Sequence, residues 1–219
     1  MKKITKLYIK NTVLIFTLFL MGSCDLKLQE PYDFQPELAE EITFKDQTAW
    51  DWIQKQTTIA GAAALSIEKF DYLIQAIKQT GLEAEFSKAG DKRTFLLLNN
   101  AAFAGTGKLI PLLTGSATGT LDKADKTRLT NVLKYHIVDA YVDQIVALPV
   151  YGAQYEFKTL LEGPNGIIKF TRNERLSITI NSAADLPTTK KSAAVYRHNY
   201  IFGNGIGHIM NAHVGITTF

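Results

Sequence analysis

The chain has 219 residues, 46% of them hydrophobic and 21% charged, which is typical of a soluble globular protein. Its 24 Lys and Arg residues slightly outnumber its 21 Asp and Glu residues, but four of the lysines lie close to the N-terminus, at Lys2, Lys3, Lys6 and Lys10. Without those four, 20 basic residues face 21 acidic ones, a net charge of −1. A nearly neutral domain has no electrostatic basis for binding nucleic acid, so that class of partner is excluded.

The N-terminus has the pattern of a secretory signal. An uncharged run from Val13 to Met21 follows the lysines and is too short to span a bilayer comfortably. It leads into Leu20-Met21-Gly22-Ser23-Cys24, which resembles the lipobox of bacterial lipoproteins. The resemblance implies that residues 1–23 are removed and that the Cys24 thiol is acylated. A lipid anchor would then hold the protein in the bacterial cell envelope, at the outer membrane. A plain secretory signal or an uncleaved anchor is the alternative.

The segment after the signal, residues 24–45, contains two prolines and several acidic residues, so we expect a tether between lipid and domain. The alternative is an ordered strap along the domain, with Phe34 and Phe44 as its apolar contacts. Cys24 is the only cysteine of the chain, and therefore the folded part has no disulfide and no thiol nucleophile.

Two helices are expected first. Residues 46–56 begin with Asp46, a suitable N-cap, and place Trp50 and Ile53 on one face. Residues 66–81 show the clearer pattern, because Ser66 can cap a helix and Gly81 stands where it would stop. The apolar residues of this second helix recur at helical spacing and should face the core: Ile67, Phe70, Ile74 and Ile77.

A buried strand and a third helix follow. In residues 93–103, a run of apolar side chains ends at Asn99-Asn100, which indicates a strand closed by an Asx turn. Residues 105–126 are rich in glycine, threonine and serine, and we expect a loop around a short apolar segment with Pro111 at its centre. Asp122 can cap a helix that runs to Tyr135 or His136.

From Tyr141 onward, short stretches rich in Ile, Val, Phe, Tyr and Thr are separated by turn residues. The expected strands lie in residues 155–161, 166–172, 176–182, 192–202 and 205–219. Pro164-Asn165-Gly166 is a strong turn signal between the first two. Helices come early and strands late, without regular alternation or a repeat, so the expected fold class is α+β and not a doubly wound sheet.

Several motifs together resemble the fasciclin domain. Residues 94–103, TFLLLNNAAF, correspond to the family's T-x-F-A-P-T-N-x-A-F motif, with Leu98 and Asn99 at its Pro and Thr positions. Tyr135-His136 ends a helix before a strand, as in the family, and residues 204–208, NGIGH, correspond to its closing N-G-V-I-H segment. The opening helix FDYLIQAIKQTGL, the TLLEG segment and Ile180-Asn181 match in the same order.

This resemblance implies one domain over residues 46–219, with a compact β-wedge or sandwich flanked by helices. It also implies adhesion or extracellular binding without a catalytic centre. The family often has Asp-Ile just before its N-G segment, where this chain has Tyr200-Ile201. What is known of that Asp-Ile in animal members therefore does not transfer to this chain.

The histidine of the Tyr-His motif has two possible roles. His136 shares one helical face with Leu129, Val132 and Leu133, so we expect it to point inward and to bond to the backbone. The family's Tyr-His suggests the alternative, a contact with a ligand. On that alternative, the candidate binding surface is Tyr135, His136, Tyr200 and Ile201. No nucleophile signature accompanies His136, so no catalytic residue is predicted.

Metal and cofactor sites are not expected. His208 and His213 are five apart in a probable strand, where they would face opposite sides, and the chain has no H-E-x-x-H motif. The glycine-rich stretches GTGK (105–108) and GNGIGH (203–208) lack the other elements of a phosphate-binding loop and should be turns. The aromatic residues Trp50, Trp52, Tyr151 and Tyr155 could form a sugar-stacking surface, although core or loop packing is their commoner role.

The expected function is that of a lipid-anchored protein that adheres to, or recognises, an extracellular protein or glycan. Two alternatives are a sugar- or small-ligand-binding accessory of an outer-membrane uptake system and an unrecognised hydrolase. An exposed aromatic cleft would favour the first alternative, and a polar cleft with Ser or Asp beside a histidine would favour the second. A mostly flat surface would favour adhesion.

Overall fold

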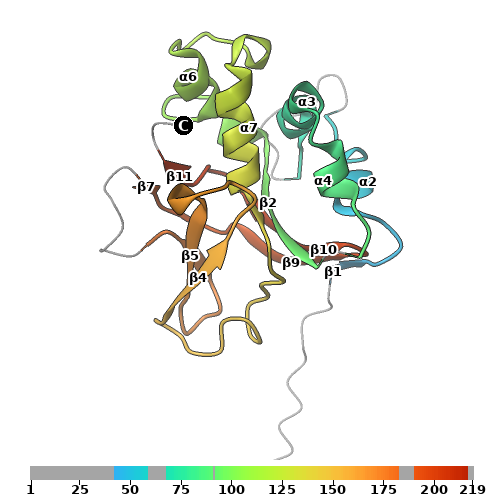
Figure 1. Cartoon of the computed structure of the whole chain (residues 1–219), viewed down its shortest axis with the longest axis vertical. Coiled ribbons are helices and arrows are strands. Elements are labelled where there is room, and N and C mark those ends of the chain that lie inside the picture. The colour runs from blue at the N-terminus through green and yellow to red at the C-terminus, as the bar shows by residue number, and fades with distance from the viewer. Residues whose placement is uncertain (1–41, 59–67, 91, 183–189, 217–219) are drawn as a thin grey trace, which may run out of the picture. The chain divides into compact units, whose positions relative to one another are not determined.

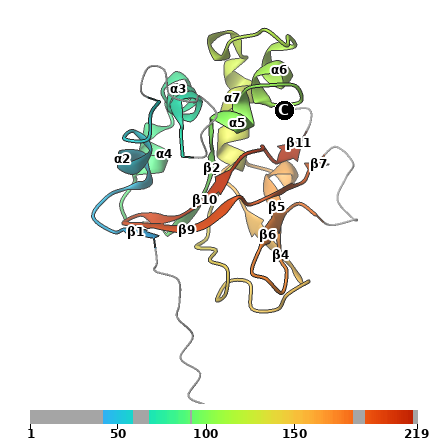
Figure 2. The same ribbon diagram turned by 180° about the vertical axis from the view of Figure 1, so that it is seen from behind.

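A five-stranded mixed sheet runs through the centre of the computed structural model, which describes residues 42–58, 68–90, 92–182 and 190–216 (Figures 1 and 2). The order of its strands is β1 (Ile42–Phe44), β9 (Arg197–Phe202), β10 (Gly205–Met210), β2 (Arg93–Leu98) and β3 (Ile137–Val138). The pairs β1–β9 and β10–β2 are parallel, whereas β9–β10 and β2–β3 are antiparallel. The described residues all belong to one compact unit.

A second, antiparallel sheet has the order β4 (Gln154–Lys158), β5 (Ile167–Arg172), β6 (Ile178–Ile180) and β8 (Ala193–Ala194). The predicted turn at Pro164–Gly166 forms the 3₁₀ helix η2 between β4 and β5. A small ribbon pairs β7 (Lys190–Lys191) with β11 (Gly215–Ile216). Residues 205–219, expected to be one strand, therefore divide into β10 and β11, and residues 192–202 divide into β8 and β9.

The helices gather at the upper end of both views, and the loops around β4 and β5 form the lower end (Figures 1 and 2). The helices are α2 (Ala49–Ile53), α3 (Asp71–Thr80), α4 (Glu83–Ser87), α5 (Asn100–Phe103), α6 (Leu109–Thr114) and α7 (Lys126–Tyr135), with the 3₁₀ turn η1 (Leu121–Lys123) before α7. Helices and sheets enclose one apolar core, in which every residue of β2 is buried. These findings confirm the predicted α+β class.

The predicted N-caps of α2 and α7 are wrong. Helix α2 is capped by Thr48 and not by Asp46, because Thr48 and Asp51 form a reciprocal capping box. Helix α7 is capped by Asp125, whose carboxylate accepts a hydrogen bond from the Arg128 amide at 2.8 Å, whereas Asp122 lies in η1. The predicted end of α7 is confirmed, since Tyr135 is its last residue.

The predicted helix at 66–81 is α3, which begins at Asp71 and ends at Gly81 in the left-handed conformation expected of a helix-terminating glycine. Phe70 and Ile77 are buried as predicted, but Leu73 and Ala76 complete the buried face and Ile74 is half-exposed. Phe70 stands at the N-cap position of α3, so the prediction of Ser66 as its cap is wrong, and Ser66 and Ile67 lie outside the described residues.

The expected loop around Pro111 contains the short helix α6. Pro111 is its third residue, a position whose backbone N–H has no partner within a helix, so the ring costs no hydrogen bond. Similarly, Asn99 does not close an Asx turn but stands at the N-cap position of α5. Local turn signals therefore marked helix starts at both places.

The expected tether reached residue 45, but the last residues of that segment belong to the sheet. Strand β1 pairs with β9 along Ile42–Phe44, opposite Tyr200–Phe202. The Phe44 ring packs against the rings of Trp52 and Phe202, with centroids 5.6 and 6.1 Å away. At Phe44 the chain is thus an ordered strap, whereas residues 1–41, with the signal, Cys24 and Phe34, lie outside the described part.

Candidate functional site

The four residues of the candidate binding surface do not form a surface. Tyr135, His136 and Tyr200 are at most 2% exposed, and Ile201 is half-buried. Tyr135 and His136 end α7, and Tyr200 and Ile201 lie in β9 of the central sheet. Three of the four side chains are buried among apolar neighbours. The prediction that these residues form one binding surface is therefore corrected.

His136 makes the backbone contacts that the helical pattern predicted. Its Nδ1 lies 2.7 Å from the Val132 carbonyl oxygen, and its Nε2 accepts a hydrogen bond from the Val214 amide at 3.1 Å. Because the Val214 amide can only donate, Nε2 carries no proton, and Nδ1–H donates to Val132. Burial lowers the pKa of His136 to about 4, so the ring is neutral at physiological pH. The structural interpretation of His136 accounts for both ring nitrogens.

The two tyrosines are also bonded in the interior. The Tyr135 hydroxyl donates to the Ile167 carbonyl oxygen at 3.1 Å and accepts from the Asn181 amide at 2.9 Å. The Tyr200 hydroxyl donates to the Glu68 carboxylate, and burial raises the pKa of Tyr200 to about 12. Each hydroxyl therefore joins separate elements of the fold.

His208 and His213 do not lie in the same strand, contrary to the prediction. His208 lies in β10, but His213 lies in the connection between β10 and β11. Both are buried, and His208 Nε2 is 2.8 Å from the Val142 carbonyl oxygen. Within the described residues, no group of three or more His, Cys, Asp and Glu side chains could hold a metal ion.

The aromatic candidates for sugar stacking separate into core and surface. Trp52 is buried, with its ring 5.2 Å from that of Tyr200 and 5.5 Å from that of Phe70. Tyr151 is 65% exposed, whereas Trp50 and Tyr155 are half-buried. The four do not form one surface, and Tyr151 belongs to a different feature.

That feature is a loop with exposed apolar side chains, residues 143–151, which we call the apolar loop. It connects β3 with β4 at the lower end of the fold (Figure 1). Its exposed side chains are Ile145 at 55%, Val146 at 81%, Val150 at 58% and Tyr151 at 65%. Single exposed apolar residues are normal, but a cluster on one loop is typical of an interaction site.

The start of the apolar loop is fixed to the central sheet. The buried Thr94 hydroxyl accepts a hydrogen bond from the Val142 amide at 2.8 Å and donates to the Ala140 carbonyl at 2.6 Å. His208 in β10 holds the Val142 carbonyl. One oxygen of Asp143 then accepts from the amides of Ile145 and Val146, at 2.7 and 2.5 Å. The exposed side chains thus begin on an ordered turn.

The second half of the loop is held by the other sheet. The Arg172 guanidinium of β5 donates to the carbonyl oxygens of Leu148 and Pro149, at 2.7 and 2.8 Å, and Leu148 itself is fully buried. The Tyr155 hydroxyl accepts from the Val150 amide at 2.9 Å. The backbone of the loop is therefore anchored on both sides of its exposed side chains.

The sequence of this loop differs from that of its neighbours. IVALPVY, residues 145–151, is strongly apolar but lies between two expected strands and has neither helical nor alternating periodicity. When an apolar segment lacks such a periodicity, its sequence does not show which side chains face the core. Only the tertiary structure shows which of its side chains are buried.

Comparison with known proteins identifies the family of the chain. A model of the fasciclin domain family matches residues 68–214. The chain belongs to the fasciclin domain family. Among solved structures, it is similar to a FAS1 domain pair from the insect cell adhesion molecule Fasciclin I, with a TM-score of 0.51 and 13% sequence identity. The match covers 76% of this chain and 50% of that chain, so this chain spans about half the length of that structure. No curated protein matches the chain significantly.

Fasciclin domains serve adhesion and extracellular binding in general and are known as non-enzymatic domains. Four pockets formed by the described residues of this fasciclin domain have volumes of about 680, 380, 410 and 390 Å³. None of these four is lined by a histidine, so none has the Ser or Asp beside a histidine that would favour a hydrolase. None of the helices in the described ranges has the length and apolarity needed for a membrane span.

Proposed function

We propose that this fasciclin domain binds an extracellular protein through the apolar loop and thereby mediates adhesion at the bacterial cell envelope. The proposal rests on one observation. Hydrogen bonds fix the backbone of the apolar loop, while its apolar side chains remain exposed to solvent. Three of those side chains, Ile145, Val146 and Val150, are aliphatic. Burial of aliphatic side chains against an apolar protein surface is favourable. Sugars, in contrast, are held mainly by aromatic rings and hydrogen bonds.

The anchoring matters for affinity. Binding costs free energy when a loop must be ordered, and a loop that is already fixed avoids most of that cost. Tyr151 adds a large side chain with few rotatable bonds, of the kind that is enriched among the dominant residues of interfaces. Weak single contacts are sufficient for adhesion when many copies act together on one surface.

The double substitution Val146→Ser/Tyr151→Ser is expected to weaken adhesion by about tenfold or more, because it removes two large exposed contacts. The free energy of unfolding should change by less than about 0.5 kcal/mol, since both side chains point to solvent. The measurement is the adhesion of beads densely coated with purified protein to a panel of immobilised extracellular matrix proteins, together with urea denaturation.

Tyr196→Ser is the matched control for this experiment. Tyr196 is 54% exposed, like Tyr151, but lies between β8 and β9 and outside the apolar loop. Its substitution should leave adhesion unchanged. Equal losses in both variants would point to a general surface effect, and the absence of adhesion by wild-type beads across the panel would contradict the proposal itself.

Adhesion at the cell envelope requires a membrane anchor. The resemblance to a lipobox implies that this anchor is a lipid on Cys24. Cys24→Ala is expected to release the protein from membranes or to leave the signal uncut, because each CH₂ group of an acyl chain contributes about 0.8 kcal/mol when buried in lipid. Membrane fractionation with intact-mass measurement tests this. A soluble wild-type protein without added lipid mass would contradict the anchor without affecting the adhesion experiment.

A further inference from the structure

A second, chemically different site lies where the five strands of the central sheet begin or end. A pocket of about 380 Å³ is formed by the residue after β1, the residue before β2, the segment after β3 and the β9–β10 hairpin. Its lining residues are Lys45, Lys92, Tyr141, Ile201, Phe202, Gly203 and Gly205. Two lysines beside an apolar lining are the combination that recognises a ligand with an anionic group on an apolar body.

Among the described residues, the charged side chains that line this pocket are all basic. The other three pockets each combine basic with acidic side chains: Lys78 with Asp71 and Asp122, Arg172 and Arg175 with Glu174, and Lys158 with Glu162. In the pocket at Lys45 and Lys92, no acidic residue is among the described lining residues.

Within the described residues, the ammonium groups of Lys45 and Lys92 make no hydrogen bond or ion pair. Other lysines do, such as Lys55 with Gln47 and Lys169 with Glu156. Two like charges on one pocket repel each other and are stabilised when an anion lies between them.

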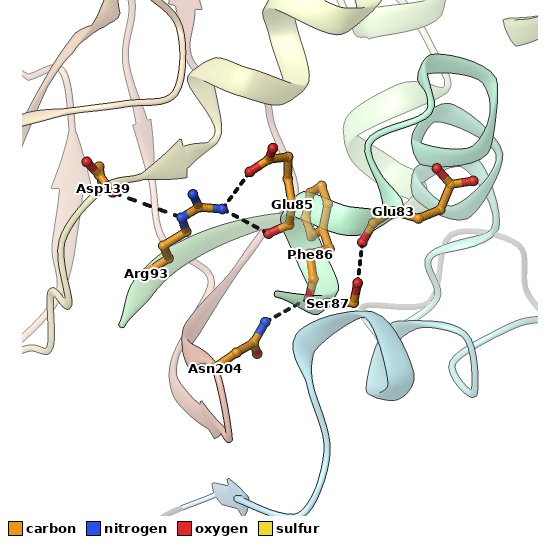
Figure 3. Close-up of polar contacts among 7 residues, drawn as sticks. All are labelled: Glu83, Glu85, Phe86, Ser87, Arg93, Asp139 and Asn204. Atoms are coloured by element: carbon orange, nitrogen blue, oxygen red, sulfur yellow. Dashed lines mark hydrogen bonds and ion pairs between the residues drawn. The ribbon is translucent and has the colours of Figure 1, made fainter. Parts of the chain in front are cut away.

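Polar contacts hold the residues next to the pocket in place. Figure 3 shows the Arg93 guanidinium directed toward Glu85 and Asp139, with an Arg93–Glu85 ion pair of 2.7 Å. Arg93 follows Lys92 directly and is committed to this network. The side chain of Asn204, in the β9–β10 turn, donates to the Phe86 carbonyl at 2.9 Å, also shown in Figure 3, and accepts from the Ala49 amide at 2.9 Å.

Close backbone packing keeps the wall of the pocket in place. Gly205 has a φ of +155°, and a Cβ at this position would lie 2.2 Å from the Arg93 carbonyl oxygen. Any other residue there would force the hairpin away from β2. The closely packed backbone at Gly205 and the two lysine side chains together make a preformed site.

We propose that this pocket binds an acidic sugar unit of an extracellular glycan, with the carboxylate or sulfate between Lys45 and Lys92 and the apolar face of the ring against Tyr141 and Ile201. The choice of a glycan rests on the proposed extracellular function. The site itself is separate from the apolar loop, so a protein contact and a glycan contact are available to the same domain.

The test is a titration of the purified protein with glucuronic acid, with N-acetylglucosamine 6-sulfate as the sulfated arm and glucose as the neutral arm, followed by NMR. At least one acidic sugar should bind about tenfold more tightly than glucose, because the charge-assisted contacts require the anionic group. Raising the salt concentration from about 0.05 to 0.5 M should weaken this binding, since both ammonium groups are exposed to solvent.

The variant Lys45→Glu/Lys92→Glu should lose about tenfold or more of the affinity for the acidic sugar, because attraction becomes repulsion. Lys123→Glu/Lys126→Glu is the matched control, with the same change in net charge at exposed positions of η1 and α7. It should retain the wild-type affinity within about twofold. Circular dichroism and urea midpoints confirm that both variants fold.

Three outcomes would overturn the proposal: no binding of either acidic sugar, equal binding of the acidic sugars and glucose, or equal losses in the pocket variant and the control. Val146→Ser/Tyr151→Ser separates this inference from the proposed adhesion. That variant should bind glucuronic acid normally while losing bead adhesion. If pocket binding fails and loop-dependent adhesion persists, the acidic-sugar site is wrong and the adhesive loop stands.

Discussion

Lowering the pH from about 7.5 to 5 is expected to reduce the free energy of unfolding by at least about 4 kcal/mol, because buried histidines must remain uncharged in the folded state. His136 and His208 are both buried and both contact backbone groups. Burial lowers the pKa of each to about 4 from an ordinary value of 6.5. Between these values the unfolded chain binds a proton at each site and the folded chain does not.

The sign and the window follow from this difference. Protons favour the unfolded state, so the stability is greatest above about pH 6.5 and falls as the pH drops toward 4. At pH 5 each histidine contributes a loss of about 2 kcal/mol, from roughly 1.5 units of pH below the unfolded pKa at 1.36 kcal/mol per unit. His198 and His213 act in the same direction, since burial lowers their pKa values to about 4 and about 3.

Urea denaturation at several pH values measures this effect. His136→Gln and His208→Gln keep a polar side chain but cannot take up a proton, so each variant should show a smaller loss between pH 7.5 and 5, even if its stability at neutral pH is lower. A wild-type stability that is constant over this range, or a slope that neither variant reduces, would show that the buried rings are not the groups that titrate.

Asn204→Ala is expected to destabilise the protein by about 4 kcal/mol, a large part of the total for a typical domain. Asn204 is 2% exposed, and its side chain satisfies two backbone groups from separate helices. It accepts from the Ala49 amide and donates to the Phe86 carbonyl, the second of which Figure 3 shows. Alanine would leave both groups buried without a partner. Each such group costs about 1–3 kcal/mol, because water cannot replace the lost bond.

Asn173→Ala is the matched control for Asn204→Ala. The Asn173 side chain also accepts hydrogen bonds from two amides, those of Arg175 and Ser177, both at 2.9 Å, but it lies in an exposed turn. Water can satisfy those amides, so the expected loss is below about 1 kcal/mol. Similar urea midpoints for the two variants would mean that Asn204 does not connect the helices in the way that its contacts indicate.

The elements with a strong local pattern could be predicted from the sequence. Strand β2 has an uninterrupted apolar run, α3 ends at Gly81, and α7 ends at Tyr135 with Leu129, Val132, Leu133 and His136 on its buried face. In each case the side-chain period or a residue with special backbone preferences decides the structure locally. The same local information was ambiguous at helix starts, where Asp46 competes with Thr48 and Asp122 with Asp125.

The candidate binding surface does not follow from such local patterns. Tyr135, His136, Tyr200 and Ile201 were grouped because of a family motif, but motif membership does not distinguish a residue that holds the fold from one that meets a partner. The side-chain contacts make that distinction, since Tyr135 bonds to Ile167 and Asn181 inside the fold. Conversely, Val146 and Tyr151 belong to no motif, and their exposure depends on how Arg172 and Thr94 hold the surrounding backbone.

The sequence by itself determined the fold class, the family resemblance and the inward direction of His136, because periodicity and short-range chemistry act over a few neighbouring residues. Only the tertiary structure decided which apolar residues stay in solvent and which charges lie together. Lys45 and Lys92 are 47 positions apart in the chain, and they line one pocket because parallel pairing brings β1 to β9 and β10 to β2. Such long-range pairing depends on the packing of the whole core, which no local pattern encodes.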